Sequence, residues 1–239
     1  MYRTPNWFRL CRATEGTDGY VLSEAEGAAD GDFRDAKLYA AMMEALHAAD
    51  DAGATSAQLL LARHYMSTRL DENHEAEQES LQQRALALFE RAAKGGNAAA
   101  QYDLGDFYAQ GTVVAQDNAT ALEWYHAAAR QQHAGALYML GCMYEKGLGV
   151  QASLEEAVAF YTQAAYLGHT EAMVRLGQIY YNGEGVKQDR VEGIMWYCRA
   201  CELGDMKAQI FLEELVEILD EYHALRQPKA GEEQLRINS

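Results

Sequence analysis

Long apolar runs are missing from this sequence, in which no stretch of about 18 apolar residues occurs. A membrane-spanning helix needs roughly that length, so we expect none. The opening residues, MYRTPNWFRLCRATEG, also lack the apolar segment of a secretory signal. The sequence therefore predicts a cytoplasmic protein, or a periplasmic one if a leader has been removed, with no insertion into a membrane.

Cysteine is scarce, and Cys11, Cys142, Cys198 and Cys201 are too scattered to form a disulfide framework. Two of them make up the CxxC of CRAC at 198–201, a spacing found in redox and zinc sites. No second CxxC and no paired histidines complete a tetrahedral zinc site. We therefore interpret these cysteines as packing residues, with a redox or metal role as the alternative, and expect no metal site and no cofactor.

Basic residues are outnumbered, because 20 Lys and Arg face 36 Asp and Glu, which gives a formal net charge of −16. Binding to nucleic acid needs clustered Lys and Arg to neutralise phosphates, so nucleic acid is disfavoured as a partner. An anionic membrane surface is disfavoured for the same reason. A basic protein would instead be attracted, mainly through faster encounter.

Several short motifs recur every 36 residues between residues 100 and 208. Motifs shared at that step predict a repeat, because so many coincidences do not arise by chance. The motifs are Leu-Gly at 104, 140 and 176; Tyr at 108, 144 and 180; Gly at 111, 147 and 183; an aromatic pair at 124, 160 and 196; and Ala at 100, 136, 172 and 208.

An earlier, altered copy precedes these repeats. Ala57, Leu61 and Tyr65 match the next copy at a step of 43, whereas Phe89 returns to the step of 36. Seven extra residues therefore lie within the acidic stretch STRLDENHEAEQES. The residues before this copy indicate the second helix of a degenerate repeat.

Each repeat has the pattern of two helices joined by a turn. Gly147 suits the left-handed residue that ends the first helix, and Gly149 eases the turn that follows. Capping boxes are predicted at Ser153 with Glu156, at Asp189 with Glu192, and, in the altered copy, at Ser80 with Gln83. GLGV is therefore predicted to be a turn, since the Gly-Lys-Ser/Thr of a phosphate loop is absent.

Glycines also recur inside the first helices, at Gly105, Gly141 and Gly177, where each costs roughly 1 kcal/mol relative to alanine. A glycine retained in every copy indicates close approach of two helices, with a bulky Tyr or Trp packed over the gap. The aromatic pairs at 124–125, 160–161 and 196–197 are accordingly predicted to be core. A single helix pair cannot bury its apolar face alone, so the copies must stack.

These motifs resemble the Sel-one-like repeat family, a relative of the tetratricopeptide repeats. Three copies match over 98–205, and the altered copy matches with its insertion. The resemblance implies an all-α, right-handed superhelix, or solenoid, of antiparallel helix pairs that binds other proteins, usually without catalysis. Local departures from the family pattern are Ala62, Val113, Gln132 and Ser153.

The predicted organisation has repeats in the middle and different ends. The apolar side of 206–226, set against a row of acidic residues, suits a capping helix that closes the solenoid. In chain order we expect an irregular segment at 1–33, a helix of a degenerate repeat at 34–53, a repeat with an acidic insertion at 54–97, repeats at 98–133, 134–169 and 170–205, the capping helix at 206–226, and a disordered tail at 227–239.

One stripe of the first helices is the candidate partner-binding surface. On a helical wheel, Tyr102 and Asp106 fall opposite the side that carries Leu104 and Tyr108, and in related solenoids that opposite stripe lines the concave groove. The alternative is that Tyr102 and Tyr138 only brace adjacent repeats. Transfer of the register gives Leu59, Arg63, Met66, Tyr102, Asp106, Tyr138, Cys142, Glu145, Val174, Gln178 and Tyr181 as candidates.

Functionally, the sequence favours a bacterial, non-enzymatic scaffold or adaptor that binds a protein partner, with a basic protein as one candidate. The alternative is an immunity protein that neutralises a secreted bacterial toxin, which the strong acidity also fits. An enzyme that uses Cys198 and Cys201 is a remote alternative, because none of the common hydrolase, zinc-protease, nucleotide-binding or kinase motifs is present.

Overall fold

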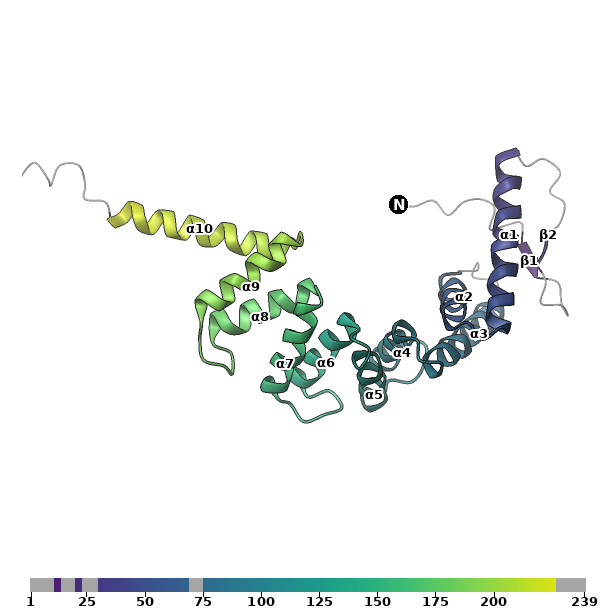
Figure 1. The fold of residues 1–239 in the computed structure, drawn as a ribbon, viewed down its shortest axis with the longest axis horizontal. Coiled ribbons are helices and arrows are strands. Elements are labelled where there is room, and N and C mark those ends of the chain that lie inside the picture. Colours follow the sequence, from purple (N-terminus) through teal and green to yellow (C-terminus); the bar gives the residue numbers. More distant parts are fainter. Residues whose placement is uncertain (1–10, 14–19, 23–29, 69–74, 227–239) are drawn as a thin grey trace, which may run out of the picture. The chain divides into compact units, whose positions relative to one another are not determined.

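The computed structural model describes residues 11–13, 20–22, 30–68 and 75–226, with side chains described for 39–68 and 77–218. The chain divides into two units, Met1–Ala100 and Gln101–Ser239, whose boundary falls within one helix. Within the described residues the fold is built from ten helices packed in consecutive antiparallel pairs (Figure 1). The predicted all-α fold of helix pairs is therefore confirmed, with one small two-stranded sheet added.

That sheet lies within 1–33, the segment that was expected to be irregular. Its two strands pair antiparallel, with Arg12 opposite Val21. The first helix then begins at Asp30, four residues before the expected start. The elements of the first unit are β1 (Cys11–Ala13), β2 (Tyr20–Leu22), α1 (Asp30–Asp51), α2 (Thr55–Ser67) and α3 (Glu75–Lys94).

The core of the first unit lies between α2 and α3, with α1 packed on α2. Small and large apolar residues alternate there, so that the helices approach closely. An ion pair between Arg91 of α3 and the buried Asp50 of α1 joins these two helices, with 2.8 Å between Nη2 and Oδ1. The fully or almost fully buried core residues are Leu61, Ala62, Phe89, Ala92 and Ala93.

The capping box predicted at Ser80 is wrong. The helix that it was to begin starts at Glu75, so Ser80 lies inside α3. Part of the seven-residue insertion therefore forms extra helix, because its Glu- and Gln-rich sequence favours helix. The rest of the insertion, at 69–74, lies outside the described residues, as does the tail at 227–239.

In the second unit each repeat forms one antiparallel pair. The elements that remain are α4 (Ala98–Gln110), α5 (Asn118–Ala129), α6 (Ala134–Lys146), α7 (Leu154–Tyr166), α8 (Thr170–Asn182), α9 (Arg190–Glu202) and α10 (Met206–Arg226). The unit boundary follows Ala100, so α4 contributes its residues from Gln101 onward.

The predicted contact between a helical glycine and an aromatic ring is confirmed in three repeats. A Cβ atom added to Gly105 would lie 2.5 Å from the ring of Tyr125, and one added to Gly141 would lie 2.5 Å from Tyr161. At Gly177 the corresponding distance to Tyr197 is 2.9 Å. A side chain there would force the ring to move, so glycine is favoured where the two helices of a repeat meet.

The turns between paired helices also match their sequence signals. Gly147 and Gly149 have left-handed backbone angles, with φ of 68° and 70°. Ser153 and Asp189 each cap the following helix, because their side chains accept a hydrogen bond from the backbone N–H three residues later. These local signals fix where α6 ends and where α7 and α9 begin.

Candidate partner-binding surface

The eleven candidate residues, here called the first-helix stripe, lie on α2, α4, α6 and α8. Leu59, Arg63 and Met66 belong to the first unit, and the other eight belong to the second. Leu59 and Val174 retain only 7% and 8% of their exposed surface, so they are part of the core and offer a partner little to touch. The helical wheel assigned both residues to the first-helix stripe, but neighbouring side chains cover the helix at these two positions.

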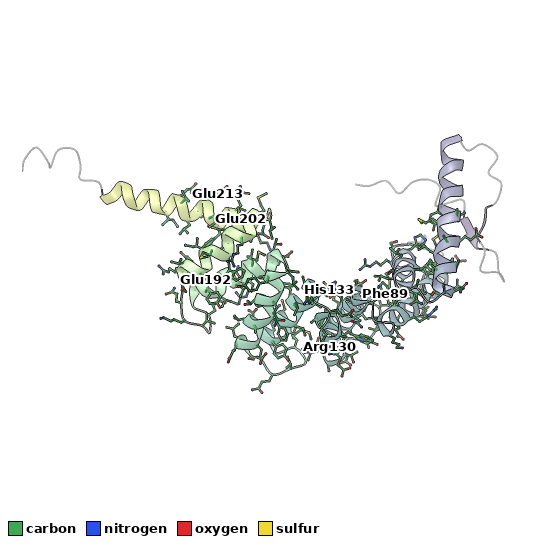
Figure 2. The ribbon with its side chains drawn as sticks, in the orientation of Figure 1. Phe89, Arg130, His133, Glu192, Glu202 and Glu213 are labelled. Carbon is green, nitrogen blue, oxygen red and sulfur yellow. The ribbon has the colours of Figure 1, made fainter. Side chains whose placement is uncertain are left out.

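Two tyrosines of the first-helix stripe each stack on the histidine that directly precedes the next first helix. The ring centroids of Tyr102 and His133 are 4.8 Å apart, and those of Tyr138 and His169 are 4.6 Å apart. Both pairs are near parallel, with interplanar angles of 27° and 18°. All four residues follow the step of 36, so adjacent repeats present the same stacked pair (His133 is labelled in Figure 2).

Each stacked pair lies beside a carboxylate that is held by a core tyrosine. The Tyr125 hydroxyl donates to Oδ1 of Asp106 at 2.6 Å. In the next repeat the Tyr161 hydroxyl donates to Oε2 of Glu145 at 2.6 Å, and its oxygen lies 3.4 Å from Sγ of Cys142. The core therefore fixes three side chains of the first-helix stripe in one position each.

Arg175 of α8 extends this network between two repeats. Its guanidinium donates to both oxygens of Glu145 on α6, and to Oε2 of Glu184 at 2.7 Å. It also donates to Oε1 of Gln178 at 3.1 Å. A planar guanidinium with several donors suits this bridging role. The arginine is therefore already neutralised by two carboxylates.

The pKa values follow from this arrangement. Burial, followed by the nearby Asp106 carboxylate, raises the pKa of Tyr102 to about 12, so its hydroxyl remains protonated at neutral pH. Burial alone would raise the pKa of Glu145, but hydrogen bonds from Arg175 and Tyr161 outweigh it and lower that pKa. The surface thus presents a protonated Tyr102 and, in the next repeat, an ionised Glu145.

The stripe changes character at α8, its last helix in the second unit. Tyr181 packs edge to face on Phe211 of α10, with ring centroids 5.2 Å apart, and the Arg190 guanidinium lies 5.6 Å from the Tyr181 ring centroid. No histidine stack forms here, because Val174 and Asp205 occupy the positions of the tyrosine and the histidine.

The two histidines and Arg175 were not predicted from the sequence. His133 and His169 are 36 residues apart, so the repeat itself contained the signal. Arg175 could not be found in that way, since the preceding repeat has Met139 at the same position. Only the folded chain brings Arg175 to Glu145.

The alternative interpretation of CRAC was a redox or metal site. Cys198 is exposed on α9 and Cys201 is half-buried, and neither forms a disulfide. Across the described residues, no three His, Cys, Asp or Glu side chains are grouped so that they could hold a metal ion. In the same part of the chain, no helix combines the length and the apolar character that a membrane crossing requires.

Comparison with known proteins gives one family. The family model described as Sel1 repeat matches residues 76–97, 98–133, 134–169 and 170–205. No curated protein matches the chain.

Solved structures share this fold. A protective antigen of uropathogenic Escherichia coli, which displays an SLR fold, is 32% identical over 70% of this chain with a TM-score of 0.63, and the match spans 34% of its own length. A Sel1 repeat protein from Oxalobacter formigenes is 26% identical over 72% of this chain and 74% of its own, with a TM-score of 0.60. An immunity protein from Pseudomonas aeruginosa is 22% identical with a TM-score of 0.34, over 74% of this chain and 73% of its own, which is too distant to bear on function.

Proposed function

Because the chain belongs to the Sel1 repeat family, whose members are typically protein-binding scaffolds, we propose that it is a non-enzymatic adaptor. It binds a partner protein through the first-helix stripe of α4, α6 and α8. The partner inserts side chains between the stacked tyrosine–histidine pairs of adjacent repeats. Catalysis is no part of this role.

The observation that supports this proposal is that the half-buried aromatic side chains are held in place by neighbouring rings. Tyr102 and Tyr138 are each held by a histidine on one side and by a core tyrosine on the other, with the Tyr102–Tyr125 and Tyr138–Tyr161 centroids 5.9 Å and 5.7 Å apart. Binding loses affinity when side chains must be immobilised, so side chains that are already fixed bind at lower cost. Tyrosine is also among the residues that contribute most at protein interfaces.

Charge supports a partner with basic groups. Asp106 and Glu145 both lie on the first-helix stripe, and the whole chain carries a net charge of −16. Arg175, a cation beside these carboxylates, already pairs with Glu145 and Glu184. An approaching Lys or Arg would therefore meet a negative potential, which mainly speeds association.

The test is capture of partners by wild-type protein and by the double variant Tyr138→Ala/Tyr181→Ala. We expect the partner to be lost from the variant, with binding weakened at least about tenfold, since hot-spot truncations cost about 2 kcal/mol or more. Tyr166→Ala is the matched control, because Tyr166 lies at the end of a second helix and is 73% exposed.

Circular dichroism and thermal unfolding check that each variant is folded. Capture that persists in the folded double variant would show that the first-helix stripe is not the contact surface.

The strong acidity equally suits an immunity protein that neutralises a basic, secreted toxin. The same experiment separates the two roles, because a captured toxin that kills cells lacking this chain would make it an immunity protein. A captured signalling or assembly protein would make it an adaptor. Either role is proposed for the cytoplasm, where the cysteines Cys142, Cys198 and Cys201 would stay reduced.

A further inference from the structure

Helix α10 occupies the place of a first helix in the repeat register, yet it is not built to receive a second helix of the same kind. The step of 36 places Glu213 where α8 has Gly177. In α8 that glycine leaves room for the Tyr197 ring, which would lie 2.9 Å from an added Cβ. A glutamate at this position excludes such a ring, both by its size and by its charge. The turn glycine is also replaced, because Leu219 stands at the position of Gly183 and the helix continues.

The apolar side of α10 nevertheless keeps the residues that earlier repeats bury. In α8, Leu176 and Ile179 are both fully buried. Their counterparts in α10, Leu212 and Leu215, are only half-buried. The α10 stripe, as we call this apolar surface, consists of Leu212, Leu215, Val216 and Ile218, of which Val216 and Ile218 are 56% and 62% exposed.

The contacts of α10 explain this difference. Its N-terminal half packs on α9 through the buried Ala208 and the half-buried Phe211 and Leu212. The Phe211 ring stacks on Tyr197, with centroids 4.0 Å apart. Beyond this anchor, Leu215, Val216 and Ile218 follow one side of a helix that is 21 residues long. A helix of that length, anchored at one end, presents a surface to a partner helix.

The flanks of the α10 stripe are acidic. On a helical wheel, Glu213 and Glu217 border it beside Val216, and Glu214 borders it beside Ile218. All three glutamates are exposed (Glu213 is labelled on α10 in Figure 2), and none forms an ion pair with a described cation. Glu213 accepts only a hydrogen bond, from Nε2 of Gln209 at 2.9 Å.

We propose that the α10 stripe binds an amphipathic helix with basic flanks from a partner protein. The apolar residues of that helix cover Val216 and Ile218, and its Lys or Arg side chains pair with the glutamates on either side. A second copy of this chain is a poorer occupant, because its α10 would bring the same glutamates into contact with these. The inference goes beyond the proposed function, since α10 carries no residue of the first-helix stripe.

The experiment measures binding of a fluorescent 21-residue peptide, the length of α10, to the full chain by anisotropy. The peptide is an amphipathic helix with leucine at the a and d positions and lysine elsewhere. A second peptide has glutamate in place of every lysine. We expect the lysine peptide to bind at least about tenfold more tightly than the glutamate peptide, and binding to weaken as salt is raised.

Variants then locate the binding site. Val216→Ser/Ile218→Ser should weaken binding of the lysine peptide at least about tenfold, because two exposed apolar side chains are lost without disturbing the core. Val191→Ser/Met195→Ser is the matched control on α9, where both residues are exposed. Glu213→Gln/Glu217→Gln should reduce the salt dependence, whereas Glu155→Gln/Glu156→Gln on α7 should leave it unchanged.

Three results would overturn the inference. Equal binding by the α10 and α9 variants would mean that the lysine peptide recognises acidic surface in general. A dimer detected by sedimentation that Val216→Ser/Ile218→Ser abolishes would make a second copy the occupant. Peptide binding that appears only after residues 227–239 are removed would assign the stripe to the chain's own tail. None of these variants alters Tyr138 or Tyr181, so failure here leaves the proposed function standing.

Discussion

The repeats at 98–133 and 134–169 bring the same ring against the same glycine but connect that ring to different acids. The Tyr125 ring lies over Gly105 just as the Tyr161 ring lies over Gly141. The first tyrosine donates to the residue directly after its glycine, Asp106, whereas the second donates to a carboxylate four residues after its glycine. The repeat thus conserves the packing of the tyrosine ring on the glycine, whereas the acid that accepts from the tyrosine hydroxyl differs between copies.

The ends of these two repeats differ in the same manner. Gln132 has a left-handed backbone, with φ of 59°, at the position where Gly168 has φ of 88°. The next residue is a histidine that directly precedes a first helix in both cases. His133 accepts a hydrogen bond from the Ala136 backbone at Nδ1, whereas Nδ1 of His169 is buried without one. Equivalent positions in the two repeats therefore share their backbone geometry, but their side chains differ in backbone strain and in hydrogen bonding.

The largest effect should come from filling the glycine gap. Alanine at Gly141 or Gly105 gains about 1 kcal/mol of helix propensity but overpacks a buried ring at a cost of about 3 kcal/mol. We therefore expect each to lower the free energy of unfolding by about 2 kcal/mol. Urea denaturation measures this loss.

Gly177→Ala is the graded control for that prediction, because the gap there is wider and the loss should be smaller. A gain in stability at Gly141 would show that the helices separate without cost and that the contact does not constrain the repeat.

A smaller effect is expected at the left-handed position that ends each repeat. Exchanging glutamine and glycine there should raise the stability in one repeat and lower it in the other. A left-handed backbone costs a residue with a side chain about 1 kcal/mol relative to glycine, so Gln132→Gly should stabilise the protein by about that amount. Gly168→Gln should destabilise it by a similar amount, since nothing lies within 4 Å of an added Cβ and only the backbone is strained. Differential scanning calorimetry of both variants measures this, and equal signs would contradict it.

The apolar framework of the fold was predictable because it depends on spacing. The step of 36 identified Gly105, Gly141 and Gly177 as sites of close approach, and turn glycines and capping residues marked the helix ends. The prediction failed at Ser80, where the local pattern of a cap was present but the preceding residues also favour helix. A cap forms only where the chain before it leaves the helix, and the spacing alone does not reveal that.

The candidate surface was only partly predictable. A helical wheel gives the direction of a side chain but not what covers it, so Leu59 and Val174 were placed on the stripe although they are buried. The stacked histidines lie in the loops between repeats, away from the helices on which the wheel was drawn. Arg175 reaches Glu145 across 30 residues of sequence, and no local pattern encodes that contact. The partner-binding role of the remaining stripe residues stays a prediction.

The smallest effect concerns pH and arises at His169, at the end of the repeat at 134–169. Burial lowers the pKa of His169 below the ordinary value of 6.5, and the nearby Glu171 opposes this shift only in part. The unfolded chain therefore binds this proton more readily than the folded chain. Stability contributed by His169 is fully present above about pH 6.5 and is lost as the pH falls below that value.

His169→Asn should remove this contribution and supply the missing cap. Asparagine already has that role at the equivalent position, where Oδ1 of Asn97 accepts from the Ala100 backbone at 3.1 Å. We expect the variant to be at least as stable as wild type at neutral pH and to lose less stability on acidification. His64 and His126, whose pKa values burial also lowers, are present in both proteins, so the difference between the two unfolding curves isolates His169. Parallel curves would mean that the folded chain tolerates a protonated His169, and that the buried Nδ1 imposes no cost on this repeat.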